Sequence, residues 1–423
     1  MTINPLARRG ISCLVAALFT LVIPGAFAQQ ADADASLSQG WPAWLTEAMA
    51  KETRKLRTSK VVLGDGLIKT RLAGKRQGEP QPIEDGWYVT SDIRAGAPLE
   101  CWAFTTVVDL ATIAGNIAEQ SMLAGEQAYG PLGDRTLYHV EAGAYDGAPY
   151  LALEWFFAMG EPPNKRVGLT KVRVAVKDEL SLVCAHNFLG YRETFANAFE
   201  QFVREANFDS GGPSPYYEEI VLHKIGEQTI GVSRSTFTLD AEGDTQINIL
   251  ESSLVPVDGT TLSISDTWYS GFSRPDGTLI NQQVAKSENG ELTMNIALEP
   301  QEDGAWSVSG LLQGKEISQE LNGAVRPVSE LGQMMAVEAL LADAQREVTT
   351  LDVWVPAADP TQFLQAQVAL DPAGRDEGRG RLTMGPLTMS ARFDSSGSLL
   401  NAGMQAGAAQ MELERIWVRG TPH

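Results

Sequence analysis

Residues 178–215 read DELSLVCAHNFLGYRETFANAFEQFVREANFDSGGPSP, and this stretch decides how the chain is organised. A short apolar run over 181–185 predicts a strand that is covered on both faces, and Gly190 favours a turn after it. From Tyr191 to Ala206 apolar residues recur every three or four positions, which predicts an amphipathic helix. The Gly, Ser and Pro residues that follow can continue neither a helix nor a central strand.

The same stretch predicts the division into domains. We expect an α+β domain over 41–208, a linker over 209–216 and a β-rich domain over 217–423. Glycine, serine and proline have little to pack against a core, so a linker is the simplest reading of the run that separates the two domains.

The N-terminus has the features of an export signal. Two arginines precede an apolar run over 11–23, and Ala26 and Ala28 are the small residues that fit a signal-peptidase site. The apolar run is too short to span a bilayer about 30 Å thick, which disfavours a membrane anchor. We therefore expect a signal peptide over 1–28 and a flexible tether over 29–40, with the mature protein periplasmic or secreted.

The composition is that of an ordinary globular protein, with 43% hydrophobic and 20% charged residues. The net charge is −20, and cleavage after Ala28 would make it −22 because the signal peptide carries two arginines and no acidic residue. Such acidity disfavours nucleic-acid binding, which requires clustered Lys and Arg. No second long apolar run follows, so we expect a soluble mature chain with no membrane span.

Only two cysteines, Cys101 and Cys184, remain after signal cleavage. An exported chain with two cysteines has one possible intramolecular pairing. The sequence therefore predicts a disulfide between them.

The first half predicts an antiparallel sheet with covering helices. Apolar periodicity favours helices over 109–122 and 191–206, and helix-forming residues favour another over 45–56. Asp146-Gly147 is typical of a tight hairpin turn. The expected strands are 61–72, 86–91, 100–107, 137–144, 150–158 and 167–176.

The second half alternates short apolar and polar runs between turn residues, which predicts an antiparallel sheet system. One helix interrupts it, from Ser329 to Arg346. We expect this helix to lie against the concave face of the sheet, where it either plugs a half-barrel or lines a cavity for an apolar ligand. A core helix explains the same apolar stripe. The candidate ligand-lining residues are Leu331, Met334, Met335, Leu340 and Leu341.

Several phrases of this second half resemble a known family. The segments 220–231, 354–356, 393–397 and 411–415 are similar to the strand phrases of exported half-barrels of the lipoprotein-localisation type. The resemblance implies a curved antiparallel sheet, or half-barrel, wrapped around a helix or an apolar ligand. In the first half, the strand, turn and helix around 191–195 look like the PsbP-type α/β sandwiches, which are mostly non-catalytic accessory proteins.

Two short phrases look like catalytic motifs. Residues 101–104 match the tetrapeptide around the nucleophile of papain-like proteases, but the oxyanion-hole residues of that motif are absent and Cys101 has an expected disulfide partner. Residues 209–213 match the nucleophile loop of chymotrypsin-like proteases, but His186 lies too close in sequence for that relay. Both phrases are better explained as structure.

Metal sites and phosphate loops have no support in the sequence. The four histidines are scattered, without a second ligand at helical or finger spacing, and no Gly-Lys-Ser/Thr phosphate loop occurs. We therefore expect no cofactor, no metal and no enzymatic activity. The favoured function is an exported binding or accessory protein, whose partner is an apolar small molecule or an envelope protein. The alternative is an envelope hydrolase with an unrecognised active site.

Overall fold

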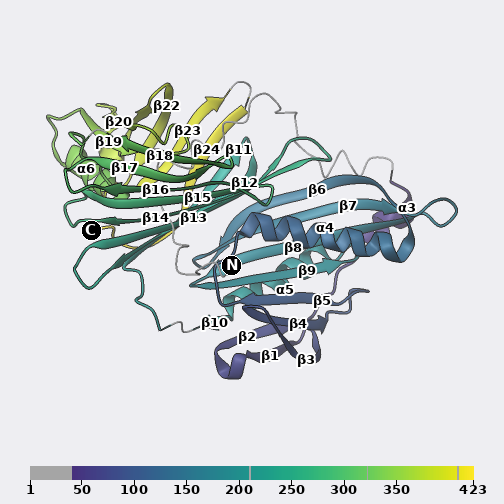
Figure 1. The fold of residues 1–423 in the computed structure, drawn as a ribbon. Helices are drawn as coiled ribbons and strands as arrows, with labels where there is room; N and C mark the ends of the chain where they lie inside the picture. The colour runs from purple at the N-terminus through teal and green to yellow at the C-terminus, as the bar shows by residue number, and fades with distance from the viewer. Residues whose placement is uncertain (1–40, 209–210, 322, 407–408) are drawn as a thin grey trace.

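The computed structural model describes residues 41–208, 211–321, 323–406 and 409–423. The predicted signal peptide and tether lie outside these residues. The described chain forms antiparallel sheets of seven, three and fourteen strands with α-helices packed on them (Figure 1). The α+β fold class expected from the sequence is confirmed.

The first domain is built on a seven-stranded sheet with the strand order β3-β4-β5-β9-β8-β7-β6. The strand expected at 181–185 is β9 (Leu180–Asn187), of which all residues but the last are buried. The other six strands are β3 (Lys75–Ile83), β4 (Gly86–Asp92), β5 (Leu99–Phe104), β6 (Leu132–Tyr145), β7 (Ala148–Met159) and β8 (Arg166–Lys177). The three-stranded sheet contains β1 (Thr58–Leu63), β2 (Ile68–Ala73) and β10 (Asn207–Phe208), with a 3-10 turn η2 (Gly64–Gly66) between the first two.

Two helices cover opposite faces of the seven-stranded sheet. α5 (Arg192–Arg204) buries Phe195, Phe199 and Phe202 in a core that also contains residues of β1 and β2. α4 (Leu110–Tyr129) packs on the other face, and Leu151 of β7 belongs to its core. Both helices were expected, and α4 continues seven residues beyond its predicted end. Burying three Phe side chains stabilises α5 far more than any surface ion pair could.

The helix predicted over 45–56 is wrong beyond its first turns. α3 (Ala43–Met49) ends early, and the chain then runs along the N-terminus of α5. The Lys51 carbonyl accepts from Tyr191 N at 2.7 Å, and the Glu52 carboxylate accepts from Thr194 N at 2.8 Å. These residues satisfy donors that α5 leaves free, and a negative charge at a helix N-terminus is favourable, so capping outweighs local helix propensity.

In the fourteen-stranded sheet the chain starts in the middle at β11, runs out to one edge, crosses to the other edge and returns to the middle at β24. Its order is β18-β17-β16-β15-β14-β13-β12-β11-β24-β23-β22-β21-β20-β19, so β18 and β19 form the two edges and the sheet stays open. The strands before the crossover are β11 (Tyr217–Ile225), β12 (Gln228–Leu239), β13 (Thr245–Pro256), β14 (Leu262–Ser273), β15 (Leu279–Glu288), β16 (Glu291–Pro300), β17 (Trp306–Leu312) and β18 (Lys315–Leu321). Those after it are β19 (Val348–Trp354), β20 (Phe363–Leu370), β21 (Arg379–Met384), β22 (Leu387–Phe393), β23 (Leu399–Ala406) and β24 (Ala409–Gly420), with a 3-10 turn η3 (Arg375–Glu377).

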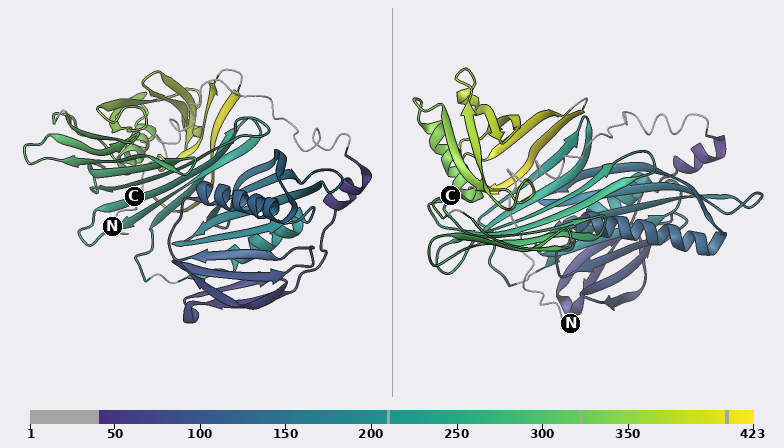
Figure 2. Two further views of the ribbon diagram at one scale, coloured as in Figure 1. Left: turned by 45° about the vertical axis from the view of Figure 1, so that its right-hand side comes forward. Right: turned by 45° about the horizontal axis from the view of Figure 1, so that its top comes forward.

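The crossover between the two edges contains α6 (Glu330–Ala342), which packs on one face of this sheet (Figure 2). We call this face the inner face and the opposite one the outer face. Ser329 caps the helix by accepting from Gly332 N at 3.2 Å, and Arg375 donates to the Leu340 carbonyl at 2.9 Å near its end. The predicted start of the helix and its position against the sheet agree with the structure, but the helix ends at Ala342, before the predicted Arg346.

The two predicted domains share one hydrophobic core. α4 contacts β7 and β8 of the seven-stranded sheet and also β13 and β14 of the fourteen-stranded sheet. Ile220 and Leu222, which alternate with inner-face Val221, lie on the outer face and join the α4 core. Figure 2 shows α4 between the two sheets. A helix expected to cover one sheet is therefore buried between two, which fixes the domains against each other.

The disulfide predicted from the sequence is confirmed. Cys101 on β5 and Cys184 on β9 lie directly opposite each other in adjacent strands and are bonded. Both cysteines are fully buried in the core under α5.

Candidate functional site

The five residues predicted to line a ligand site all lie on α6 but divide between two apolar clusters. Leu331 and Met334 are buried beside Tyr217 and Trp354, with Met335 half-buried at the same cluster. Leu340 is fully buried with Val353 and Phe393 in a second cluster, with Leu341 half-buried at its margin. Within the described residues these side chains pack against protein. Their contact with a ligand stays a prediction.

Farther along the strands, the inner face changes from apolar to polar. On β11 the inner residue Val221 is followed by His223, and on β13 Ile249 is followed by Glu251 and Ser253. Strand pairing places Ser233 beside Glu251, and Glu251 beside Thr267. We call this set of side chains the polar band: His223, Ser233, Glu251, Ser253, Ser265 and Thr267.

A third, smaller apolar cluster follows the polar band. Ile225 succeeds His223 on β11, and Val255 succeeds Ser253 on β13. These two side chains pack with Ile230, Met404 and Met411. The polar band therefore lies between apolar surfaces, with the α6 clusters on one side and this cluster on the other.

Five of the six residues of the polar band are buried and Ser265 is half-buried, and the band is incompletely hydrogen-bonded within the described residues. His223 Nε2 lies 3.2 Å from Ser233 Oγ. Three atoms have no hydrogen-bond partner there: His223 Nδ1, Ser265 Oγ and Thr267 Oγ1. Each buried polar atom without a partner costs roughly 1–3 kcal/mol. A group that supplied the missing hydrogen bonds would remove this cost.

Burial also fixes the protonation state of His223. It lowers the pKa of the imidazole to about 4, so the ring is neutral at pH 7, with one nitrogen a donor and the other an acceptor. Gly231, directly opposite on β12, leaves room for the ring, because a Cβ atom at 231 would lie 3.3 Å from His223 Nδ1 and 2.9 Å from the Ser252 carbonyl oxygen. The neutral ring can donate a hydrogen bond to a bound molecule from one nitrogen or accept one at the other.

Ser233, His223 and Glu251 supply the three residue types of a serine-hydrolase triad, but their geometry does not fit that triad. The distance from His223 Nδ1 to Glu251 Oε1 is 3.9 Å, beyond a hydrogen bond. An imidazole with a pKa near 4 is a weak general base at neutral pH. Ser233 is inside a strand paired on both sides, so its backbone N–H is engaged in the sheet and offers no oxyanion hole. The arrangement is better suited to binding than to acyl transfer.

The structure gives no catalytic arrangement to the described residues of the two protease-like phrases or to His139 and His186. Cys101 is bonded to Cys184 and cannot supply a thiolate. His139 contacts the Glu141 carboxylate at 3.4 Å, and His186 is buried against Phe195. Ser210 lies outside the described residues. Within those residues, no three His, Cys, Asp or Glu side chains are grouped so that they could hold a metal ion.

None of the residues of the polar band is among the ligand-lining residues predicted from the sequence. The sequence does contain a signal for this band: serine, glutamate and histidine occupy alternate positions in strands that are otherwise apolar on the same side. Which face those positions take depends on the packing of α6, and the sequence alone leaves this open.

Comparisons with known proteins find only loose similarity. No family model matches the chain, and no curated protein matches it. A beta-barrel-like protein of a domain of unknown function, DUF1849, from Brucella abortus matches 49% of this chain and 98% of its own, with 12% identity and a TM-score of 0.36. The cyanobacterial PsbP of Synechocystis sp. PCC 6803 matches 36% of this chain and 92% of its own, with 14% identity and a TM-score of 0.24.

These comparisons support a loose resemblance to a beta-barrel-like protein and to PsbP and nothing finer. The expected resemblance to half-barrels of the lipoprotein-localisation type stays a prediction. Within the described residues, no helix has both the length and the apolarity needed to cross a membrane. The disulfide fits a location outside the cytoplasm, because disulfides persist in oxidising compartments.

Proposed function

We propose that this protein is an exported, non-catalytic binding protein of the bacterial cell envelope, periplasmic or secreted, that carries an amphiphilic small molecule on the inner face of its fourteen-stranded sheet. The apolar part of the ligand would contact the clusters on either side of the polar band, and its polar end would contact the band itself. The half-buried Met335 and Leu341 on α6 would form part of the wall.

The observation that carries this proposal is the polar band between apolar clusters. Ligand sites for small molecules are mostly apolar, with a few polar groups that fix orientation. Here the three partnerless atoms of His223, Ser265 and Thr267 supply such groups. The polar band contains no lysine or arginine that could pair with an anionic end, and a buried charge without a partner is costly. We therefore favour a ligand whose polar end is neutral, such as a hydroxyl or ester group.

Extraction and direct binding test this proposal. Organic extracts of the mature protein, purified under native conditions, would be examined by mass spectrometry for a bound amphiphile. A fluorescent monoacylglycerol and a fluorescent fatty acid would then be titrated into the same protein. We expect the neutral probe to bind more tightly than the fatty acid, because the polar band offers the carboxylate of the fatty acid no cationic partner.

Two matched variants localise the site. Thr267→Val removes a hydroxyl from the polar band, whereas Thr236→Val makes the same change on the outer side of β12, where the hydroxyl bonds to the Asn248 carbonyl. Loss of one hydrogen bond of about 1 kcal/mol should weaken probe binding roughly fivefold in the first variant and leave it unchanged in the second. If neither probe binds and no amphiphile is extracted, the carrier function is wrong and an accessory role remains.

The second candidate is an envelope hydrolase, and the contact between Ser233 and His223 is the observation that favours it. A fluorophosphonate probe labels an activated serine covalently. Labelling that disappears in Ser233→Ala would establish this function in place of the first. The long distance to Glu251 leads us to expect no labelling.

A further inference from the structure

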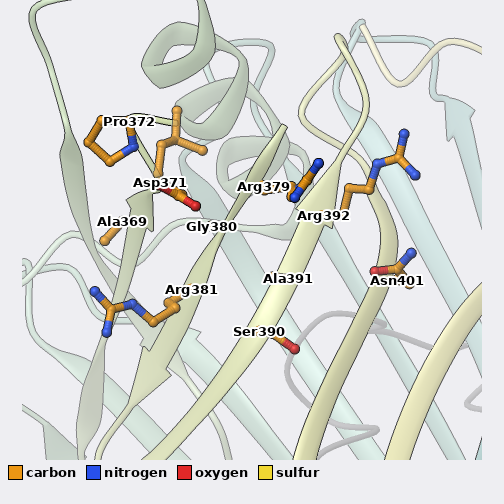
Figure 3. A pocket seen from close by; sticks show the side chains of 11 residues that line it. Ala369, Asp371, Pro372, Arg379, Gly380, Arg381, Ser390, Ala391, Arg392 and Asn401 are labelled. Atoms are coloured by element: carbon orange, nitrogen blue, oxygen red, sulfur yellow. The ribbon is translucent and has the colours of Figure 1, made fainter. Parts of the chain in front are cut away.

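A groove opens on the outer face of β20, β21, β22 and β23, on the opposite face of the sheet from the polar band. Its volume is about 560 Å³, within the range of small-molecule sites. Three arginines line it, Arg379, Arg381 and Arg392, together with Ser390 and Asn401 (Figure 3). The α4 core does not reach these four strands, so this part of the outer face is open to a ligand.

Strand alternation places the arginines on this face. Leu382 and Met384 of β21 are buried on the inner face, so Arg379 and Arg381 point outwards. On β22, Met389 and Ala391 are buried in the same inner cluster, so Arg392 points outwards as well. Three positive charges from two neighbouring strands therefore share one surface.

Arg381 is open because its cross-strand neighbours are short. It lies opposite Ala369 on β20 and Ser390 on β22, neither of which reaches a guanidinium group. Within the described residues the Arg381 side chain makes no hydrogen bond or ion pair. All five of its N–H donors are thus available for a ligand.

Arg379 and Arg392 lie directly opposite each other, and like charges in this position are unfavourable. Glu377 compensates in part: its carboxylate bonds to Arg379 Nε at 2.9 Å, and its carbonyl accepts from Arg392 Nε at 3.1 Å. Asp371 also borders the groove, but its carboxylate accepts from Ala373 N in its own turn. Three positive charges against two negative ones leave the groove positive in a chain of net charge −20.

We propose that this groove binds a phosphate group of a small molecule or of a lipid headgroup. Guanidinium groups match the oxygens of a phosphate with paired hydrogen bonds, and the Asn401 amide adds a neutral donor. A phosphate carries more charge and more acceptor oxygens than a carboxylate. A phosphate ligand therefore matches three arginines better than a carboxylate ligand would. Arg381 supplies the principal contact.

Titration of the full-length mature protein with inorganic phosphate at low ionic strength, followed by calorimetry, tests the proposal. Sedimentation with phosphatidylglycerol vesicles, compared with neutral phosphatidylcholine vesicles, tests the lipid source. Arg381→Gln removes the open guanidinium, and Arg381→Lys keeps the charge without the paired donors. Arg326→Gln is the control, since it removes an equal charge from an exposed position before α6.

We expect Arg381→Gln to weaken phosphate binding about tenfold, Arg381→Lys to weaken it less, and Arg326→Gln to leave it unchanged. Binding to phosphatidylglycerol vesicles that is lost in Arg381→Gln would identify the headgroup as the source, and binding of inorganic phosphate without vesicle binding would identify a free phosphate compound. Equal affinity in all variants, or no binding of either probe by the wild type, would overturn the proposal. The far-ultraviolet circular dichroism of each variant checks that it is folded.

Discussion

Replacing Asp266 by asparagine should change how the stability of the whole protein depends on pH. Asp266 belongs to β14, is fully buried, and caps α4 of the other domain. Its carboxylate accepts from Ala111 N at 2.9 Å, from Thr112 N at 2.8 Å and from Ser252 Oγ at 2.6 Å. Burial, and then the nearby Asp109 carboxylate, raise the pKa of Asp266 to about 6.

The size and sign of the effect follow from this pKa. The ordinary pKa of an aspartate is about 3.9, so the difference of about two corresponds to roughly 3 kcal/mol. Because the folded protein holds this proton more tightly than the unfolded chain, the contribution favours folding below about pH 4 and is lost as the pH rises to about 6. An asparagine does not titrate, so the stability of the wild type relative to Asp266→Asn should fall by roughly 3 kcal/mol between those values.

Urea unfolding at a series of pH values between about 4 and 7, followed by circular dichroism, measures this difference. Glu299→Gln, which removes an exposed carboxylate on β16, controls for the general effect of charge. Asp266→Ala leaves two amides and one hydroxyl without an acceptor, and should lower the free energy of unfolding by about 3 kcal/mol or more at pH 7. A difference between wild type and Asp266→Asn that stays constant over the whole pH range would refute the reasoning.

Two further predictions concern α6 and the linker. Leu340→Ala should lower the free energy of unfolding by roughly 2–5 kcal/mol, and Leu341→Ala by less, because Leu340 is fully buried and Leu341 only partly. If α6 is a plug, uptake of a fluorescent fatty acid should rise in Leu340→Ala, whereas a fall would show that the helix lines an existing pocket. Brief digestion with proteinase K should cut within 211–214, where every residue is exposed. The two fragments should then co-elute on size exclusion, since α4 joins both domains in one core, and separation of the fragments would contradict a shared core.

The sequence by itself determined those features that depend on residues close together in the chain or on residue counts. The spacing of Phe195, Phe199 and Phe202 is sufficient to predict α5, because a helix with one apolar stripe must bury it. With the predicted signal peptide removed, two cysteines leave one pairing, so the Cys101–Cys184 bond was predictable without any coordinates. The apolar stripe of α6 and the β-rich character of the second half followed from periodicity in the same way.

Only the tertiary structure decided which surface each face of a helix or sheet contacts. The pairing of β11 with β24 joins residues nearly two hundred positions apart, and no local pattern encodes that partner. That pairing and the position of α6 together make the polar band an inner surface and the arginine groove an outer one. Asp266 shows the same limit. It caps α4 because the fold brings the two within hydrogen-bond distance, although Thr112 and Asp266 are 154 residues apart in the sequence. Periodicity fixes which side chains share a face, while the identity of the opposing surface depends on contacts between distant segments.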